Sequence, residues 1–214
     1  MTNPDTDIDK RKNEFAQILK NYVPESAAML CAELIIHYRL HLHIETERKT
    51  KYGDYSPHLG KGNRISINHN LPKFEFLFTF IHELAHHTTY LKFGPKHKAH
   101  GEEWKQEFKN CIKPFLLHDI FPNDLKSAII KHMQNPKYSH SADVNLLRAF
   151  RIYNDKTNHL VLDNLKEGSL FKMKNSDVIM QKKHKLRTYY YCVAINTNKA
   201  YKVHAMAEVI ESKF

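Results

Sequence analysis

The stretch Leu71–Gly94, LPKFEFLFTFIHELAHHTTYLKFG, decides how the rest of the chain is interpreted. Its first half alternates phenylalanine with other residues and is also compatible with a strand. A proline at the second position, the absence of breakers before Gly94 and a length of about 20 residues favour a helix instead. Such a helix is apolar over most of its surface, so we expect it to be buried with a narrow polar strip facing a cleft.

That polar strip contains HELAH, in which His82 and His86 are four residues apart. On a helix this spacing places both imidazoles on one face, one turn apart, where they can bind a single ion. Glu83 projects about 100° further round the helix, so it can act on a water at the ion without becoming a ligand. HExxH also occurs by chance as an ordinary polar patch, and this chain has 16 histidines. A third ligand is therefore needed to distinguish the two interpretations.

Two histidines follow the helix, and they differ in how well they suit a metal. A catalytic zinc takes three protein ligands and keeps one position open. His97 lies between two lysines, whose charge disfavours a cation, whereas His100 begins HGEEWKQEF, which reads as a second helix. Packing would hold a ligand at that helix entrance. The residues thus predict one Zn²⁺ per chain, bound by His82, His86 and His100.

HELAHH followed by HGEEW resembles the SprT-like metalloprotease domain, also found in the Spartan proteases, whose pattern is HExxH followed by HGxxF/W. TKYGDYSP and GNRISINHNL resemble the paired strands that precede the active helix in that family, so the resemblance extends over about Leu40–Phe115. It implies an α+β, zincin-like fold and zinc-dependent peptide hydrolysis, with Glu83 as the catalytic carboxylate. It also implies that Gly101 and Trp104 anchor the third ligand, and that Arg64–Asn68 is the cleft edge that pairs with substrate.

Several members of that family clear proteins attached to DNA. The resemblance therefore implies protein substrates that are associated with DNA or crosslinked to it, and a role in DNA repair. Many members carry a C-terminal zinc ribbon with paired cysteines, but this chain has only Cys192 in the corresponding region. Contact with DNA, single-stranded DNA in particular, would have to use other residues.

A breaker-rich segment at Asn135–Ala142 (NPKYSHSA) predicts a domain boundary. We expect a metalloprotease domain over 1–142, followed over 143–214 by a short helix and a small antiparallel β domain. From Leu160 onward, short alternating segments are separated by turns rich in Asn, Gly and Lys, which is typical of such a sheet or barrel.

The expected β domain is also the most basic part of the chain. Residues 160–214 include ten Lys or Arg and five Asp or Glu, so this quarter of the chain carries half of the net charge of +10. Basic residues beside alternating tyrosines are typical of single-strand binders, although the tyrosines can equally be ordinary strand positions. The predicted nucleic-acid residues are Lys182, Lys183, Lys185, Arg187, Tyr189 and Tyr191.

Composition limits the class of protein. Three widely separated cysteines form no disulfide framework, the N-terminal residues have no apolar signal region, and no apolar run approaches the length of a membrane span. We expect a cytoplasmic protein without a membrane partner.

Two other functions fit the same residues. The first is a nucleic-acid-binding protein with a structural zinc, whose closed site would need a fourth ligand such as His97. The second is a zinc hydrolase acting on something other than peptides. The hypothetical oxyanion donors are Tyr55 and His87. The candidates for orienting the ligand imidazoles are Asp54, Glu102 and Glu103.

Overall fold

The computed structural model describes residues 4–48, 50–57, 62–139, 142–154 and 159–212. The chain is an α+β protein that divides into two compact units, Met1–Pro136 and Lys137–Phe214. The division falls inside the breaker-rich segment, a few residues before the predicted boundary at Ala142, so that the whole segment after Pro136 belongs to the second unit.

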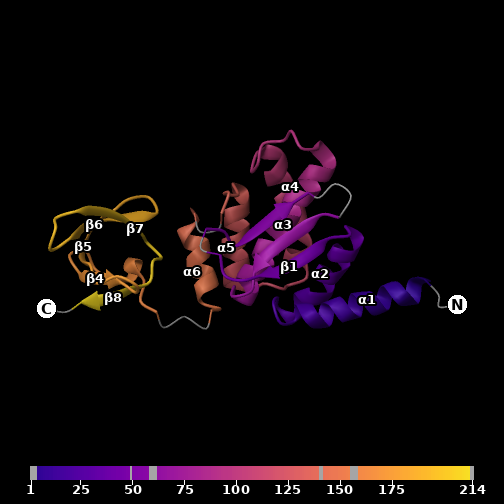
Figure 1. Ribbon diagram of the computed structural model, residues 1–214, viewed down its shortest axis with the longest axis horizontal. Coiled ribbons are helices and arrows are strands. Elements are labelled where there is room, and N and C mark those ends of the chain that lie inside the picture. The colour runs from indigo at the N-terminus through magenta and orange to yellow at the C-terminus, as the bar shows by residue number, and fades with distance from the viewer. Residues whose placement is uncertain (1–3, 49, 58–61, 140–141, 155–158, 213–214) are drawn as a thin grey trace. The chain divides into compact units, whose positions relative to one another are not determined.

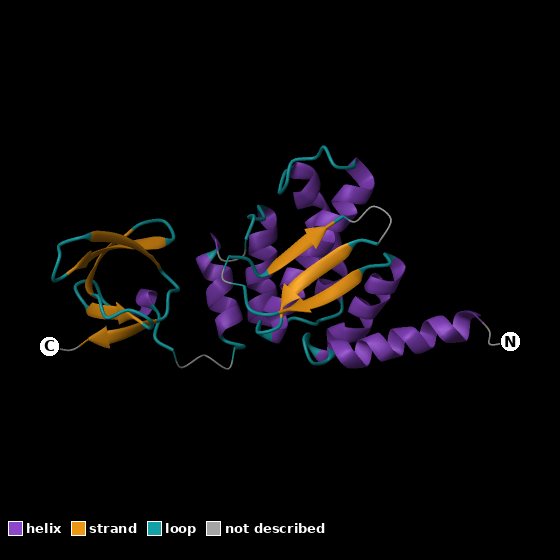
Figure 2. Ribbon diagram, in the orientation of Figure 1, coloured by secondary structure: helices purple, strands orange, loops and turns teal. Residues whose placement is uncertain are grey.

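Over its described residues, the first unit combines five helices with a three-stranded sheet (Figures 1 and 2). Both β2 and β3 contact α3, the predicted central helix. The helices are α1 (Pro4–Leu19), α2 (Glu25–His37), α3 (Lys73–Phe93), α4 (Glu102–Leu117) and α5 (Asn123–Gln134). The strands are β1 (His41–Glu45), β2 (Gly53–Ser56) and β3 (Arg64–Asn68).

Helix α3 confirms that the deciding stretch is helical. Its aromatic side chains Phe76, Phe78 and Phe80 are all buried, on more than one face, so the alternation that resembled a strand reflects a helix enclosed by protein. Gly94 ends the helix with φ of 71°, a left-handed conformation that glycine adopts without steric cost.

The sheet order β1-β3-β2 corrects one sequence prediction. β3 is the central strand, parallel to β1 and antiparallel to β2, so Arg64–Asn68 cannot be the cleft edge. The strand is buried on both faces because the polar residues Ser66 and Asn68 are also enclosed, where Arg48 donates hydrogen bonds to both side chains. The two edge strands are β1 and β2, and β2 is the one that contacts α3 extensively.

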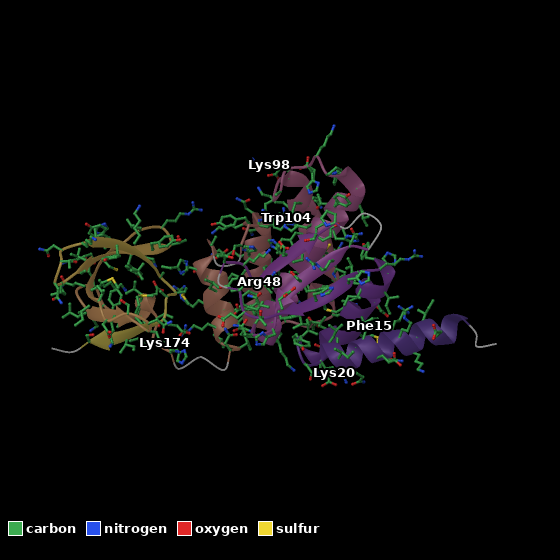
Figure 3. All side chains as sticks on the ribbon, in the orientation of Figure 1. Phe15, Lys20, Arg48, Lys98, Trp104 and Lys174 are labelled. Carbon is green, nitrogen blue, oxygen red and sulfur yellow. The ribbon has the colours of Figure 1, made fainter. Side chains whose placement is uncertain are left out.

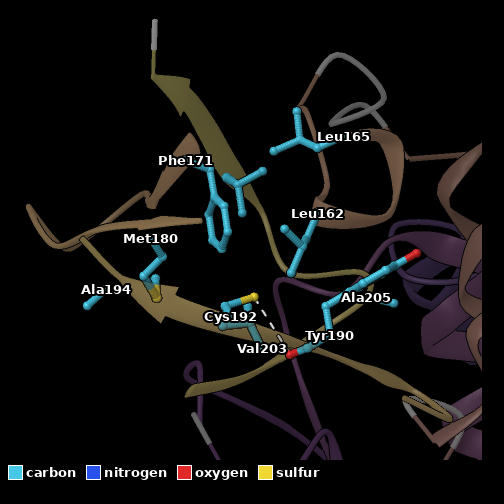
Figure 4. Close-up of a cluster of buried hydrophobic side chains, with 10 residues drawn as sticks. Leu162, Leu165, Phe171, Met180, Tyr190, Cys192, Ala194, Val203 and Ala205 are labelled. Atoms are coloured by element: carbon cyan, nitrogen blue, oxygen red, sulfur yellow. Dashed lines mark hydrogen bonds between the residues drawn. The ribbon is translucent and has the colours of Figure 1, made fainter. Parts of the chain in front are cut away.

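The described part of the second unit contains the helix α6, the short 3-10 helix η2 and a five-stranded sheet. Every neighbouring pair in the order β7-β6-β5-β4-β8 is antiparallel, as the short alternating segments predicted. One face of the sheet encloses the core shown in Figure 4, in which Phe171, Cys192 and Leu162 are fully buried. The elements are α6 (Val144–Arg151), η2 (Leu162–Asn164), β4 (Leu170–Met173), β5 (Ile179–Lys185), β6 (Tyr189–Ala194), β7 (Ala200–His204) and β8 (Val209–Ser212).

Among the residues that the structure describes, no helix has both the length and the apolar character needed to cross a membrane.

Candidate metal centre

Three imidazoles meet between α3 and the start of α4. The Nε2 atom of His100 lies 3.0 Å from Nε2 of His86 and 3.2 Å from Nε2 of His82. His82 and His86 share one face of α3, and the chain returns after Gly94 to bring His100 against them. These three residues form a group able to hold a metal ion, with ligand atoms all within 4.8 Å of one another.

The spacing of these nitrogens fits zinc. Two nitrogens that each lie about 2.0–2.1 Å from one tetrahedral zinc ion are about 3.3 Å apart. The two Nε2 separations at His100 are 3.0 and 3.2 Å. Neutral imidazole nitrogen is also a common zinc donor, and three such donors leave a fourth position free. The three nitrogens are therefore spaced as ligands of one metal ion would be.

Trp104 holds the three rings in place. It is fully buried and is labelled in Figure 3. Its ring centroid lies 4.8 Å from that of His82, 5.3 Å from that of His86 and 4.6 Å from that of His100. His100 itself has φ of 58°, an uncommon conformation for a residue with a side chain, and it directly precedes Gly101, the N-cap of α4. Strained backbone of this kind persists where the surrounding structure enforces it, and it is concentrated at functional sites.

Burial keeps these imidazoles in the form that binds metal. It lowers the pKa of His86 to about 3, with a further contribution from the neighbouring His100. Burial also lowers the pKa of His100. Both rings are consequently neutral at physiological pH, and only neutral imidazole has a lone pair available for an ion.

Glu83 lies on the adjacent face of α3, beneath β2. Burial raises its pKa to about 8, and the nearby carboxylate of Asp54 adds to this effect, whereas Lys51, Arg48 and the backbone N–H of Tyr55 lower it. A cation bound by the neighbouring imidazoles would lower this pKa, because positive charge favours the carboxylate.

Gly53 allows β2 to approach Glu83 closely. A Cβ at this position would lie 2.7 Å from Oε1 of Glu83 and 2.6 Å from Cγ2 of Thr79, closer than real contacts allow. In the sequence, Gly53 drew attention only as part of TKYGDYSP, a segment that resembles a strand of the SprT-like family. A glycine inside a short strand is itself a signal of close backbone approach, and it could have indicated this contact.

Arg48 fixes the segment that leads into β2, and it was also missed. Its guanidinium donates to Oδ1 of Asn68 at 2.8 Å and to Oγ of Ser66 at 3.0 Å. The Asn68 amide in turn donates to the carbonyls of Arg48 and Lys51 at 3.1 and 3.0 Å. This exchange ties the connection between β1 and β2 to the central strand, and so determines where β2 lies above α3.

His97 lies outside the three-histidine group. Its Nδ1 is 2.6 Å from the carbonyl of Gly94, so the ring serves the turn after α3. Among the described residues, the metal-competent group includes no fourth histidine, cysteine or carboxylate.

The proposed oxyanion donors Tyr55 and His87 contact each other. The Tyr55 hydroxyl lies 3.3 Å from Nδ1 of His87, and it donates to Oδ1 of Asn63 at 3.2 Å. The three candidates for orienting the ligand imidazoles lie in different places. Glu102 pairs with Lys105 at 2.7 Å on the surface, and the carboxylate of Asp54 raises the pKa of Glu83. A carboxylate oxygen of Glu103 lies beside Gly101, 3.1 Å from where a Cβ of that residue would be.

Structure separates the predicted nucleic-acid residues into two groups. Lys182 is buried, and its amine donates to the carbonyls of Leu162 and Leu165 at 2.8 and 2.5 Å, so it is not available to a phosphate. Lys185 pairs with Asp163 at 3.1 Å. The remaining four, Lys183, Arg187, Tyr189 and Tyr191, are exposed or partly exposed.

Comparison with protein-family models, with curated proteins and with solved structures found no match to this chain. Its function is therefore inferred from the geometry of the three imidazoles and Glu83.

Proposed function

We propose that this protein is a zinc-dependent metalloprotease with a zincin-like catalytic unit, as its resemblance to the SprT-like family implies. The observation that carries the proposal is the convergence of three Nε2 atoms at a spacing that fits one zinc ion, beside a buried carboxylate that is not part of the group. A carboxylate so placed can transfer protons without occupying a ligand position.

The roles of the residues follow from where they lie. His82, His86 and His100 hold the ion, which when bound supplies a Lewis acid that lowers the pKa of water and polarises the scissile carbonyl. Glu83 accepts a proton from the attacking water and delivers it to the leaving amine. Burial beneath β2 keeps bulk water from competing for this carboxylate.

Substrate binding is assigned to the edge of β2. An extended peptide added to this strand would run past Glu83, since Gly53 lies directly against the carboxylate. Strand addition uses backbone hydrogen bonds, so it gives affinity with little sequence preference. This suits a protease that acts on many proteins.

We favour a catalytic metal site, with one coordination position left free, over a structural site with four protein ligands. A structural zinc usually has four protein ligands. His97, the expected fourth, is held by the carbonyl of Gly94, and the described residues offer no other candidate at the group.

The decisive experiment is a protease assay on a basic protein substrate, comparing the wild type with Glu83→Gln, each with and without single- and double-stranded DNA. We expect Glu83→Gln to retain zinc and to lose about two to four orders of magnitude in rate, the usual contribution of positioned acid–base catalysis. A fully active Glu83→Gln variant would contradict the mechanism. An inactive wild type that binds zinc would favour the structural alternative.

A second candidate function, binding of single-stranded nucleic acid, is favoured by one feature of the β domain. The rings of Tyr191 and His184 stack at 5.2 Å with an interplanar angle of 15° on the sheet face opposite the core. Lys183 and Arg187 lie close to them in sequence. Aromatic rings with adjacent cations are the usual elements of single-strand recognition, so this face could bring the protease to DNA-associated substrates.

A further inference from the structure

A cavity of about 360 Å³ opens in the second unit beside β7. Its volume lies in the range of ligand pockets, about 300–1,000 Å³. It is lined chiefly by Met173, Val178, Met180, Tyr201 and Val203. Met180 and Val203 belong to the core shown in Figure 4, so the cavity extends that core to the surface. Val178 and Tyr201 are nonetheless 43% and 39% exposed, so the cavity opens to solvent between apolar side chains.

The strand that borders the cavity is an edge strand. Among the described residues, β7 (Ala200–His204) pairs with β6 on one side only. Hydrogen-bonded and non-hydrogen-bonded pairs alternate along an antiparallel ladder. At one end of this ladder, the N–H of Ala194 donates to the carbonyl of Lys199 at 2.9 Å. At the other end, the N–H of Ala205 donates to the carbonyl of Thr188 at 3.0 Å.

Counting residue pairs inward from either end of this ladder gives the same alternation of hydrogen-bonded and non-hydrogen-bonded pairs. Tyr201 and Val203 exchange hydrogen bonds with β6, whereas the backbone N–H and C=O of Lys202 point away from it. The side chains of Tyr201 and Val203 lie on the cavity side of the strand. β7 therefore offers backbone hydrogen-bonding groups at its edge and an apolar cavity on one face.

The charge on the strands at this edge is positive, although one acid, Asp177, lies between the lining residues Ser176 and Val178 and pairs with Lys172 at 3.3 Å. From Gln181 to Ala207 the chain has six Lys or Arg and no Asp or Glu. Lys199 and Lys202, which precede and lie within β7, are both exposed. A ligand with negative charge is thus favoured. A bare polyanion would leave the apolar cavity unfilled, so the cavity favours a ligand that also has bulky apolar side chains.

We infer that β7 and this cavity bind an extended segment of a partner protein, in which bulky apolar residues alternate with others and acidic residues follow. The segment adds to the edge of β7 at Lys202, and every second side chain enters the cavity. Its acidic residues lie near Lys199 and Lys202. This interaction goes beyond peptide hydrolysis and does not depend on it, because it uses the other unit and requires no metal.

Fluorescence polarisation of a labelled synthetic peptide tests the inference. In this peptide leucine and phenylalanine alternate with threonine, and a run of aspartates follows. The protein is the full chain with Glu83→Gln, so that hydrolysis does not consume the probe. One control peptide replaces the aspartates with lysines, and another replaces the threonines with prolines, which cannot donate to a strand. We expect the acidic peptide to bind at least about tenfold more tightly than either control, a difference of about 1.4 kcal/mol.

Two substitutions at one position separate the backbone contact from the charge. Lys202→Pro removes the outward N–H and leaves the ladder with β6 intact, since proline is tolerated on an edge. Lys202→Ala removes only the charge. We expect Lys202→Pro to weaken binding about tenfold more than Lys202→Ala does. Ala200→Pro, which removes another outward N–H at the start of the strand, provides the same test if circular dichroism shows that Lys202→Pro perturbs the fold.

A matched pair of tyrosines tests the cavity. Tyr201→Ser removes part of its wall, whereas Tyr189→Ser removes a tyrosine of similar exposure (43%) from the opposite face of the sheet. We expect a loss of about tenfold in affinity for the first and none for the second.

Equal affinity for the three peptides, no binding of any of them, or equal losses for Lys202→Pro and Lys202→Ala would overturn the inference. If an oligothymidine displaces the peptide and Tyr189→Ser is the damaging change, the surface binds nucleic acid and the peptide assignment is wrong.

Discussion

Two clusters of polar residues stand out in the sequence: the histidines around α3 and the lysines of β5. They differ in the partners that the folded chain gives to their side chains. The three imidazoles converge on one point, and Glu83 is buried beside them with its pKa raised. The lysines diverge. Lys182 donates to backbone carbonyls, and Lys185 pairs with Asp163, which also accepts from the hydroxyl of Tyr190 at 2.8 Å.

This difference separates residues that can bind a ligand from residues that stabilise the fold. Polar groups that the protein satisfies internally stabilise its own fold, whereas donor atoms aimed at a common point are available to a ligand. The histidines aim their donor atoms at a common point, whereas the lysines at the centre of their cluster are satisfied by the protein itself. Four predictions test this comparison, in order of decreasing effect.

The largest effect is expected at the third ligand. Asparagine tolerates the left-handed backbone of His100, so His100→Asn removes the imidazole without adding strain. We expect it to abolish stoichiometric zinc binding and to lower hydrolytic activity by at least about a hundredfold. His97→Asn, the matched control, should retain both. Elemental analysis and the protease assay measure the two outcomes, and the reverse pattern would make His97 the ligand.

Asp163 should be the stabilising centre of the lysine cluster. Burial alone would raise its pKa, but hydrogen bonds from Tyr190, Arg148 and Lys185 lower it to about 2. Because the folded pKa lies below the unfolded value, the stabilisation is complete above about pH 4 and is lost as the pH falls through 2. We expect Asp163→Asn to cost about 1–2 kcal/mol at neutral pH, since the partner cations are half exposed.

Hydrogen exchange in peptides from the second unit, measured at several pH values, reports this loss. Asp177→Asn removes a fully exposed carboxylate that pairs with Lys172 at 3.3 Å, and it should change nothing. A loss from Asp163→Asn that persists unchanged below pH 2 would show that the charge of Asp163 is not its cause.

A smaller effect is expected where β2 meets Glu83. In Gly53→Ala, the added methyl group must displace either the side chains of Glu83 and Thr79 or β2 itself. We expect the rate of hydrolysis to fall about tenfold, in line with the sensitivity of catalysis to small displacements, while zinc content stays the same. Ser56→Ala, on the same strand, should have no effect on the rate. An unaffected Gly53→Ala variant would mean that the contact between β2 and Glu83 is not required.

The smallest effect concerns the salt dependence of oligonucleotide binding. Each phosphate contact contributes about 0.7 to the slope of log K against log salt for single strands. Replacing Lys183 and Arg187 with alanine should therefore flatten the slope by about 1.4. Lys185→Ala should change it less, because its amine is paired with Asp163. If Lys185→Ala changed the slope more than the double substitution does, Lys185 would be a nucleic-acid-binding residue. The distinction drawn between the histidine and lysine clusters would then be wrong.

The sequence by itself determined the elements whose signals are local. Spacing within one helix predicted that His82, Glu83 and His86 share α3, and breakers ended that helix at Gly94. Short alternating segments predicted the antiparallel β domain. Helix periodicity and strand alternation are properties of neighbouring residues, and a single sequence is sufficient to reveal them.

Only the tertiary structure decided which distant residues meet. Strand order puts Arg64–Asn68 at the centre of the sheet and Gly53–Ser56 at one edge. Arg48 donates hydrogen bonds to the polar side chains of the central strand, which are therefore satisfied inside the protein. Burial removed Lys182 from the basic surface, because carbonyls of a distant segment accept from its amine. A lysine has the same appearance in a sequence whether its charge faces solvent or the interior. The partners that settle this come from parts of the chain far away in sequence, and only the folded chain brings them together.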